Sequence, residues 1–172
     1  GITSKRSIAK VKKLPFLNDR AVVNASPLIF LAKAGLIDFL QQAAPQILVP
    51  AAVAEEISRR GQSDITARAL ADTAWLVTVD ALVIPPLIGP GESAVLAYAH
   101  AHPGVAAIID DGAGRRCAEL LGVPLLGTLG LVMIAKKRGL IPAARPVIAR
   151  LKKQGMFLSE NTIDRAMLLI GE

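Results

Sequence analysis

Short apolar runs recur along the chain, and each is followed by a segment with helical character. Five of these runs predict strands, at residues 21–24, 46–49, 75–79, 105–109 and 124–126. The run at 105–109 is wholly apolar, which is typical of a strand buried on both faces of a parallel sheet. Helical segments of about ten residues separate the runs, and this alternation favours parallel strands joined by right-handed crossovers. We therefore predict an α/β fold, a three-layer sandwich with a central, mostly parallel sheet.

Capping and breaking residues mark the helices between these runs. Ser26 is predicted to be the N-cap of a helix over 27–42, with Pro27 in its first turn. Further helices are predicted at 50–60, 64–72, 91–101, 112–121, 128–138, 142–154 and 159–169. Residues 80–90 are rich in proline and are predicted to form an irregular rim or lid.

The length and composition indicate one folded domain with a basic extension. A chain of 172 residues with 52% hydrophobic and only 3% aromatic residues can bury an aliphatic core. Residues 1–20 hold six basic residues and one acid, which accounts for +5 of the net charge of +6. We expect 1–20 to be a disordered extension that attracts phosphate backbones, and 21–172 to form the domain.

Several classes of protein are disfavoured by the rarer residues. Cys117 is the only cysteine, so an internal disulfide and a cysteine-based zinc site are excluded. The two histidines, His100 and His102, lie together at a predicted helix end and suggest no catalytic triad. No run reaches the roughly 18 apolar residues needed to span a bilayer, and no secretion signal is recognised. We expect a cytoplasmic protein without a membrane segment.

Polar residues follow two of the predicted strands directly. Asn24 ends the first strand, and Asp110 and Asp111 follow the run at 105–109. The carboxyl ends of parallel strands meet at one edge of a sheet, where α/β proteins bind their ligands. Glu56 lies late in the second predicted helix, and Glu92 lies in the first turn of the helix at 91–101. Together they would form an oxygen-rich pocket.

Each of these acids also has a structural interpretation. Glu92 would stabilise the positive end of its helix dipole. Asp110 or Asp111 would cap the helix at 112–121, and one of the two is enough for capping.

Clustered carboxylates repel one another unless a cation neutralises them. Mg²⁺ and Mn²⁺ prefer oxygen ligands, and either ion can lower the pKa of a bound water beside a scissile phosphate. Lys33, Arg115 and Arg116 could steer or clamp that phosphate. The pattern indicates nuclease chemistry.

Five motifs stand in order along the chain: VVNASPLI at 22–29, VPAAVAEEI at 49–57, GESA at 91–94, IDD at 109–111 with the two arginines that follow, and GTLG at 127–130. Together they resemble the PIN-domain family, and within it the branch of prokaryotic VapC-like toxins that open with a Ser-Pro-Leu turn. The resemblance extends from residue 21 to the end of the chain.

The resemblance implies a Mg²⁺- or Mn²⁺-dependent ribonuclease that acts on RNA, forms a homodimer and has an antitoxin protein as partner. It implies catalytic roles for Glu56, Glu92 and either Asp110 or Asp111, both of which are candidates, and metal ligation by Asn24 with Glu92 and that aspartate. Small hydroxyl residues near such sites match Ser26 and Thr128, and Arg115 and Arg116 are expected to support substrate binding. The aliphatic surplus also favours an oligomer or a partner groove.

The chain departs from the family pattern at Asn24, which stands where the family has an aspartate. An asparagine carbonyl can ligate a hard cation but brings no charge, so we expect weaker metal binding. Two alternatives follow. The chain could be a catalytically weak or silent PIN-like module that binds RNA or a protein, or a flavodoxin-like nucleotide-binding domain. The flavodoxin-like domain is the least favoured alternative, because the sequence contains no glycine-rich phosphate loop.

Overall fold

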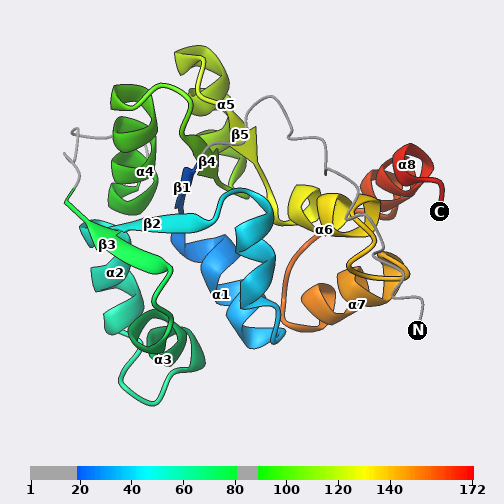
Figure 1. The fold of residues 1–172 in the computed structure, drawn as a ribbon, viewed down its shortest axis with the longest axis horizontal. Helices are drawn as coiled ribbons and strands as arrows, with labels where there is room; N and C mark the ends of the chain where they lie inside the picture. The colour runs from blue at the N-terminus through cyan, green and yellow to red at the C-terminus, as the bar shows by residue number, and fades with distance from the viewer. Residues whose placement is uncertain (1–18, 81–88) are drawn as a thin grey trace, which may run out of the picture.

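A five-stranded parallel sheet forms the centre of the protein (Figure 1). The computed structural model describes residues 19–80 and 89–172. The strand order is β3-β2-β1-β4-β5, and every neighbouring pair is parallel. The strands are β1 (Arg20–Val23), β2 (Gln46–Pro50), β3 (Leu76–Val79), β4 (Ala106–Ile108) and β5 (Leu125–Leu126). The predicted α/β architecture is therefore confirmed.

Helices cover both faces of the sheet. They are α1 (Ala25–Lys33), the 3-10 helix η1 (Ile37–Gln42), α2 (Ala51–Ser58), α3 (Ile65–Asp72), α4 (Pro90–Ala101), α5 (Gly112–Leu121), α6 (Thr128–Lys137), α7 (Arg145–Lys153) and α8 (Glu160–Ile170). Figure 1 shows α4 and α5 above the sheet, α1, α2 and α3 below it, and α6, α7 and α8 gathered at the β5 end. This arrangement is the three-layer sandwich expected from the alternation of strands and helices.

The central strands are buried because helices pack on both of their faces. Ala21, Val22 and Val23 of β1 are fully buried, and so are all three residues of β4. Such strands have no solvent-facing side, which explains why they read as continuous apolar runs instead of alternating patterns.

The first helix differs from its prediction at both ends. Asn24 occupies the N-cap position, and Ser26 lies inside the first turn, so the prediction of Ser26 as N-cap is wrong. The helix predicted over 27–42 is also wrong as a single unit, because α1 ends at Lys33 and η1 follows. Between them Gly35 has φ +71°, a left-handed conformation that glycine adopts without strain and that stops a helix.

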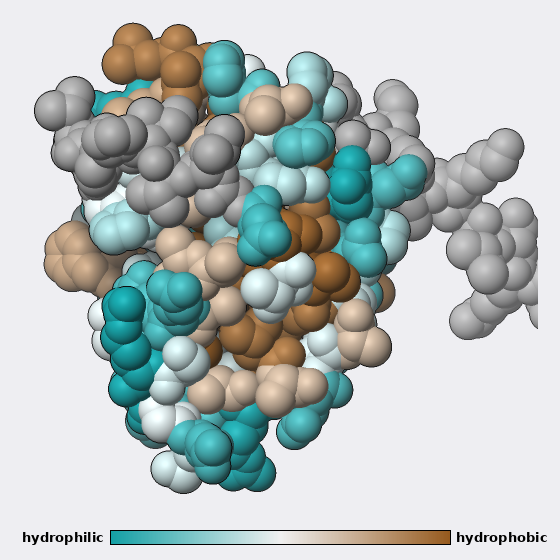
Figure 2. All heavy atoms as spheres, turned by 90° about the vertical axis from the view of Figure 1, so that its left-hand side faces the viewer, coloured by the Kyte–Doolittle hydropathy of each residue, from teal (hydrophilic) through white to brown (hydrophobic). Residues whose placement is uncertain are grey.

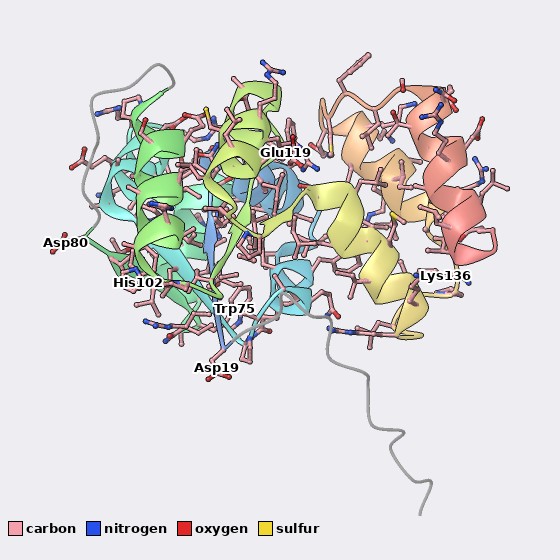
Figure 3. The ribbon with its side chains drawn as sticks, turned by 90° about the horizontal axis from the view of Figure 1, so that it is seen from above. Asp19, Trp75, Asp80, His102, Glu119 and Lys136 are labelled. Atoms are coloured by element: carbon pink, nitrogen blue, oxygen red, sulfur yellow. The ribbon has the colours of Figure 1, made fainter. Side chains whose placement is uncertain are left out.

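The N-terminal ends of the strands mark the edge of the sheet that lies away from the candidate site. Asp19 before β1, Trp75 before β3 and His102 before β4 lie on the same side of the view in Figure 3. The opposite edge, where the strands end, carries the residues that the sequence singled out. The predicted rim at 80–90 and the basic extension at 1–20 fall largely outside the described residues.

The sheet has an outer edge at β3, on the side of the molecule seen in Figure 2. Hydrophobic atoms occupy the middle of that face and hydrophilic side chains border them. Val77 and Val79 of β3 are only half-buried, as expected for an edge strand. Among the described residues, no helix is long and apolar enough to cross a membrane.

Candidate functional site

Asn24 lies at the centre of the carboxyl edge of the sheet. Its backbone N–H donates to the carbonyl of Ile108, 3.0 Å away, and so extends the pairing of β1 with β4. The side chain is 1% exposed. Its Nδ2 donates a hydrogen bond to Oε1 of Glu92 at 3.2 Å, whereas Oδ1 has no partner among the described residues. A buried acceptor without a donor is uncommon in folded proteins and calls for an explanation.

The carboxylate of Glu56 also lies close to the Asn24 amide, on the side that faces Gly91. A Cβ atom built on Gly91 would lie 3.2 Å from Oδ1 of Asn24 and 3.3 Å from Oε2 of Glu56. Two acceptor oxygens from β1 and α2 therefore face the same point beside α4. Neither oxygen can donate to the other while Glu56 is ionised, so a cation or a water molecule suits the space between them.

Glu92 turns back over the start of its own helix. It lies in the first turn of α4, which has no side-chain cap, and its side chain is half-buried. A Cβ atom on Gly89 would collide with Oε2 of Glu92. The carboxylate therefore lies against the positive end of the helix dipole and also receives the Asn24 hydrogen bond. Glu92 therefore lies in the first turn of α4, as its structural interpretation requires, and also contacts Asn24.

Asp110 is held by Thr128. Its Oδ1 accepts from the Thr128 backbone N–H at 2.8 Å, and its Oδ2 accepts from Thr128 Oγ1 at 2.6 Å. Thr128 is fully buried and is the first residue of α6. Asp110 thus caps a helix that begins 18 residues further along the chain.

Asp111 has a different partner. Its Oδ2 accepts from the backbone N–H of Gly114 at 2.8 Å, which makes Asp111 the N-cap of α5, and its side chain is exposed. The sequence left open which of the two aspartates is the cap of α5, and the structure assigns that cap to Asp111.

Arg115 brings a positive charge to the Asp110 side of the cluster. Its Nη1 donates to the carbonyl of Ile109 at 3.0 Å. A Cβ atom on Gly127 would lie 2.7 Å from that Nη1 and 3.1 Å from Oδ1 of Asp110. Only a glycine leaves room for both groups at this position. Gly91 and Gly127 stand in the sequence motifs, but the motifs do not show that each glycine leaves space beside an acid.

The remaining predicted residues lie at the border of the cluster. Arg116 is exposed near the start of α5, where its Nη1 would be 3.4 Å from a Cβ atom on Gly112. Ser26 is half-buried in the first turn of α1 and makes no hydrogen bond with the acids within the described part of the chain.

The donor set suits a hard divalent cation in its chemistry. Asn24, Glu56 and Glu92 supply one amide and two carboxylates, which together would neutralise a charge of +2. The unpartnered Oδ1 of Asn24 is an oxygen that such an ion would satisfy. Within residues 19–80 and 89–172, however, no three His, Cys, Asp or Glu side chains form a group arranged to hold a metal ion. A metal site formed by Glu56 and Glu92 would therefore need a third ligand such as the neutral Asn24.

The protein is thus a parallel α/β sandwich with acidic residues at the carboxyl edge of its sheet. The sequence model of the DUF3368 family, a PIN domain, matches residues 20–172, and the chain belongs to this family. PIN domains are a nuclease fold and generally use divalent metal ions. No curated protein matches the chain.

Proposed function

We propose that this protein is a Mg²⁺- or Mn²⁺-dependent endoribonuclease of the VapC-like toxin type. The observation that carries the proposal is the buried, unpartnered Oδ1 of Asn24, which lies near Glu56 in a side chain whose Nδ2 contacts Glu92. Leaving a buried acceptor unsatisfied costs about 1–3 kcal/mol. A cation bound here would remove that cost and balance the two carboxylates.

Asn24, Glu56 and Glu92 would hold the ion. When bound, the ion supplies a water of lowered pKa and an electrostatic partner for the charge on the scissile phosphate. The site gives the ion one carboxylate fewer than a site with aspartate at position 24 would, so its affinity is weaker.

Asp110 is the further acid of the site in this proposal. A carboxylate has about four lone-pair positions, and Thr128 uses two of those on Asp110. The other lone-pair positions of Asp110 remain free to bind an ion or a water molecule. Asp111 is placed less well, because it is exposed and caps α5.

Arg115 and Arg116 would bind the phosphate. Arg115 uses one of its five N–H donors on Ile109, which leaves the others for phosphate oxygens beside Asp110. Arg116 is exposed at the start of α5, where an RNA backbone could reach it.

Partners of this protein are also part of the proposal. Several large apolar side chains are exposed on α5, on α8 and before α8, which suits a homodimer or an antitoxin contact. They include Leu120, Phe157, Leu168 and Leu169.

One observation favours a catalytically weak module instead. The Asn24 amide already donates to Glu92, so this carboxylate is partly satisfied without an ion. Such a protein would bind RNA with the same affinity in the presence and absence of a chelator and would not cleave it.

Cleavage of a labelled single-stranded RNA with Mn²⁺, and with a chelator in its place, tests the proposal. The wild type should cleave only with the metal, and Glu92→Gln should lose at least tenfold in rate, since removing one stabilising group typically costs 10²–10³. Glu119→Gln removes an exposed acid of α5 and serves as the matched control. Equal rates for wild type and Glu92→Gln would contradict the proposal.

A further inference from the structure

Charge is distributed unevenly between the two ends of the protein. Residues 21–126 contain six basic and ten acidic residues, a net charge of −4, whereas 127–172 contain eight basic and three acidic residues, a net charge of +5. The second segment forms α6, α7 and α8, at the opposite end of the molecule from α2 and α3 (Figure 1). Lys136 accordingly lies far from Asp80, the residue after β3, in the view of Figure 3.

Three of these basic residues donate hydrogen bonds to neutral acceptors, and Lys136 also lies near enough to Glu172 to help lower the pKa of that carboxyl. Lys136 donates to the carbonyl of Pro142, Arg138 donates to Gln42, and Arg150 donates to the carbonyl of Ala34. All of these acceptors are neutral. We define the basic face as these three residues together with Lys137 and Lys153, which are exposed and form no ion pair within the described residues.

Two helices connect the basic face to the candidate site. Helix α6 begins at Thr128, which binds Asp110, and ends at Lys137. Ten residues at 1.5 Å each place the two ends roughly 15 Å apart. Helix α1 begins directly after Asn24 and ends at Lys33, and the carbonyl of the next residue, Ala34, accepts from Arg150. The basic residues thus lie about one helix length from the acids, toward the edge of the sheet where the strands begin, since Arg138 and Arg150 contact residues that precede β2.

We propose that RNA bound at the candidate site runs over the basic face, with its phosphates against α6 and α7, and not over α2 and α3. This inference rests on the proposed function for the identity of the polyanion. Charge complementarity supports this path of the RNA, because each phosphate contact with a lysine or arginine releases a counterion and so favours binding. The α2–α3 end, residues 51–72, holds four acidic residues and three arginines, and Arg59 and Arg60 pair with Glu55 and Asp64, so it offers the backbone no excess of positive charge.

Two charge-matched variants of the full chain test the direction. Lys137→Gln/Lys153→Gln removes two charges from the basic face, and Arg59→Gln/Arg68→Gln removes two exposed charges from α2 and α3. Arg59 forms only an exposed 4.0 Å ion pair with Glu55, so its loss should hardly affect the fold. Both variants keep residues 1–18, whose charge then contributes equally. Melting temperatures within about 2 °C of the wild type would confirm that both are folded.

The measurement is the affinity for a fluorescent single-stranded RNA at several salt concentrations, in a chelator so that no cleavage occurs. We expect Lys137→Gln/Lys153→Gln to bind more weakly and to make the slope of log affinity against log salt shallower by about 1.4, or 0.7 for each lost contact. Arg59→Gln/Arg68→Gln should keep the wild-type slope.

Equal slopes for the two variants would overturn the basic face as the path of the RNA. A wild type that binds no RNA at low salt would also overturn it, and would point to an acidic protein as the partner of this surface. Cleavage with Mn²⁺ is scored separately. If only the basic-face variant changes the salt slope and the wild type does not cleave RNA, the basic face is supported and the nuclease proposal is refuted. If the wild type cleaves RNA but the two variants have equal slopes, the nuclease proposal is supported and the basic face is refuted.

Discussion

Asn24 donates a hydrogen bond from Nδ2 to Oε1 of Glu92, 3.2 Å away, and leaves its own Oδ1 without a partner in the described residues. The Nδ2 group of Asn24 therefore supplies a hydrogen-bond donor to the Glu92 carboxylate, which a cation could otherwise stabilise. The Oδ1 atom of the same amide still lacks a donor or a cation beside it. This relationship explains how the acidic cluster can be stable before any ion binds.

Asn24→Asp should make the site dependent on metal. The variant loses the donor to Glu92 and places two carboxylates side by side, so we expect a loss of about 1–3 kcal/mol without metal. The melting temperature would fall by about 2–4 °C for each kcal/mol. Thermal unfolding with and without Mn²⁺ should show a larger metal-induced rise for Asn24→Asp than for the wild type. Asn161→Asp, an exposed change in α8, is the control, and equal metal-induced rises in all three proteins would refute a ligand role for position 24.

Gly91→Ala should block the site without unfolding the protein. The added methyl would lie 3.2 Å from Oδ1 of Asn24 and 3.3 Å from Oε2 of Glu56, where a bound ion or water would be displaced. Calorimetry should show Mn²⁺ affinity reduced at least tenfold. Gly130→Ala in α6 meets only an ordinary contact, 3.5 Å from Leu126, and should bind as the wild type does. Unchanged binding by Gly91→Ala would show that the ion lies elsewhere.

Thr128→Val should destabilise the protein by about 1.5–3 kcal/mol, because it removes a hydrogen bond to a charged and partly buried carboxylate. Thr128→Ser keeps the hydroxyl and should recover most of the loss. Urea unfolding measures both changes. A Thr128→Val protein as stable as the wild type would mean that the Asp110 contact contributes little to folding.

Glu172 should contribute to the loss of stability in acid. Hydrogen bonds from the backbone N–H of Ala144, and then of Arg145, lower the pKa of Glu172 below its ordinary value of 4.5. Because the pKa in the folded state is below that in the unfolded state, the contribution is complete above about pH 5 and is lost as the pH falls through the folded-state pKa. Melting temperatures between pH 7 and 3 should therefore fall less steeply for Glu172→Gln than for the wild type. Glu119→Gln should follow the wild-type curve, and a Glu172→Gln curve parallel to it would contradict this role.

The sheet could be predicted from the sequence because its central strands are apolar throughout. Val22 and Val23 have no exposed side, so a short apolar run was enough to locate β1. The break between α1 and η1 was missed, because it depends on the left-handed conformation of Gly35 and an isolated glycine does not reveal its φ angle.

The site was predicted as a set of residues but not as a set of contacts. The bond from Asn24 to Glu92 spans 68 positions in the chain, and the bonds from Thr128 to Asp110 span 18. Neighbouring aspartates look alike in a sequence, and only the packing of α5 and α6 gives Asp111 and Asp110 different partners. The space beside Gly91 is likewise set by three separate elements, β1, α2 and α4.

Calorimetric titration of Mn²⁺ into the wild type, Glu92→Gln and Glu119→Gln tests the central claim most directly. We expect saturable binding by the wild type and by Glu119→Gln, and loss of that binding in Glu92→Gln. Identical titrations of the wild type and Glu92→Gln, or no binding by the wild type at millimolar Mn²⁺, would contradict a metal site at Asn24, Glu56 and Glu92.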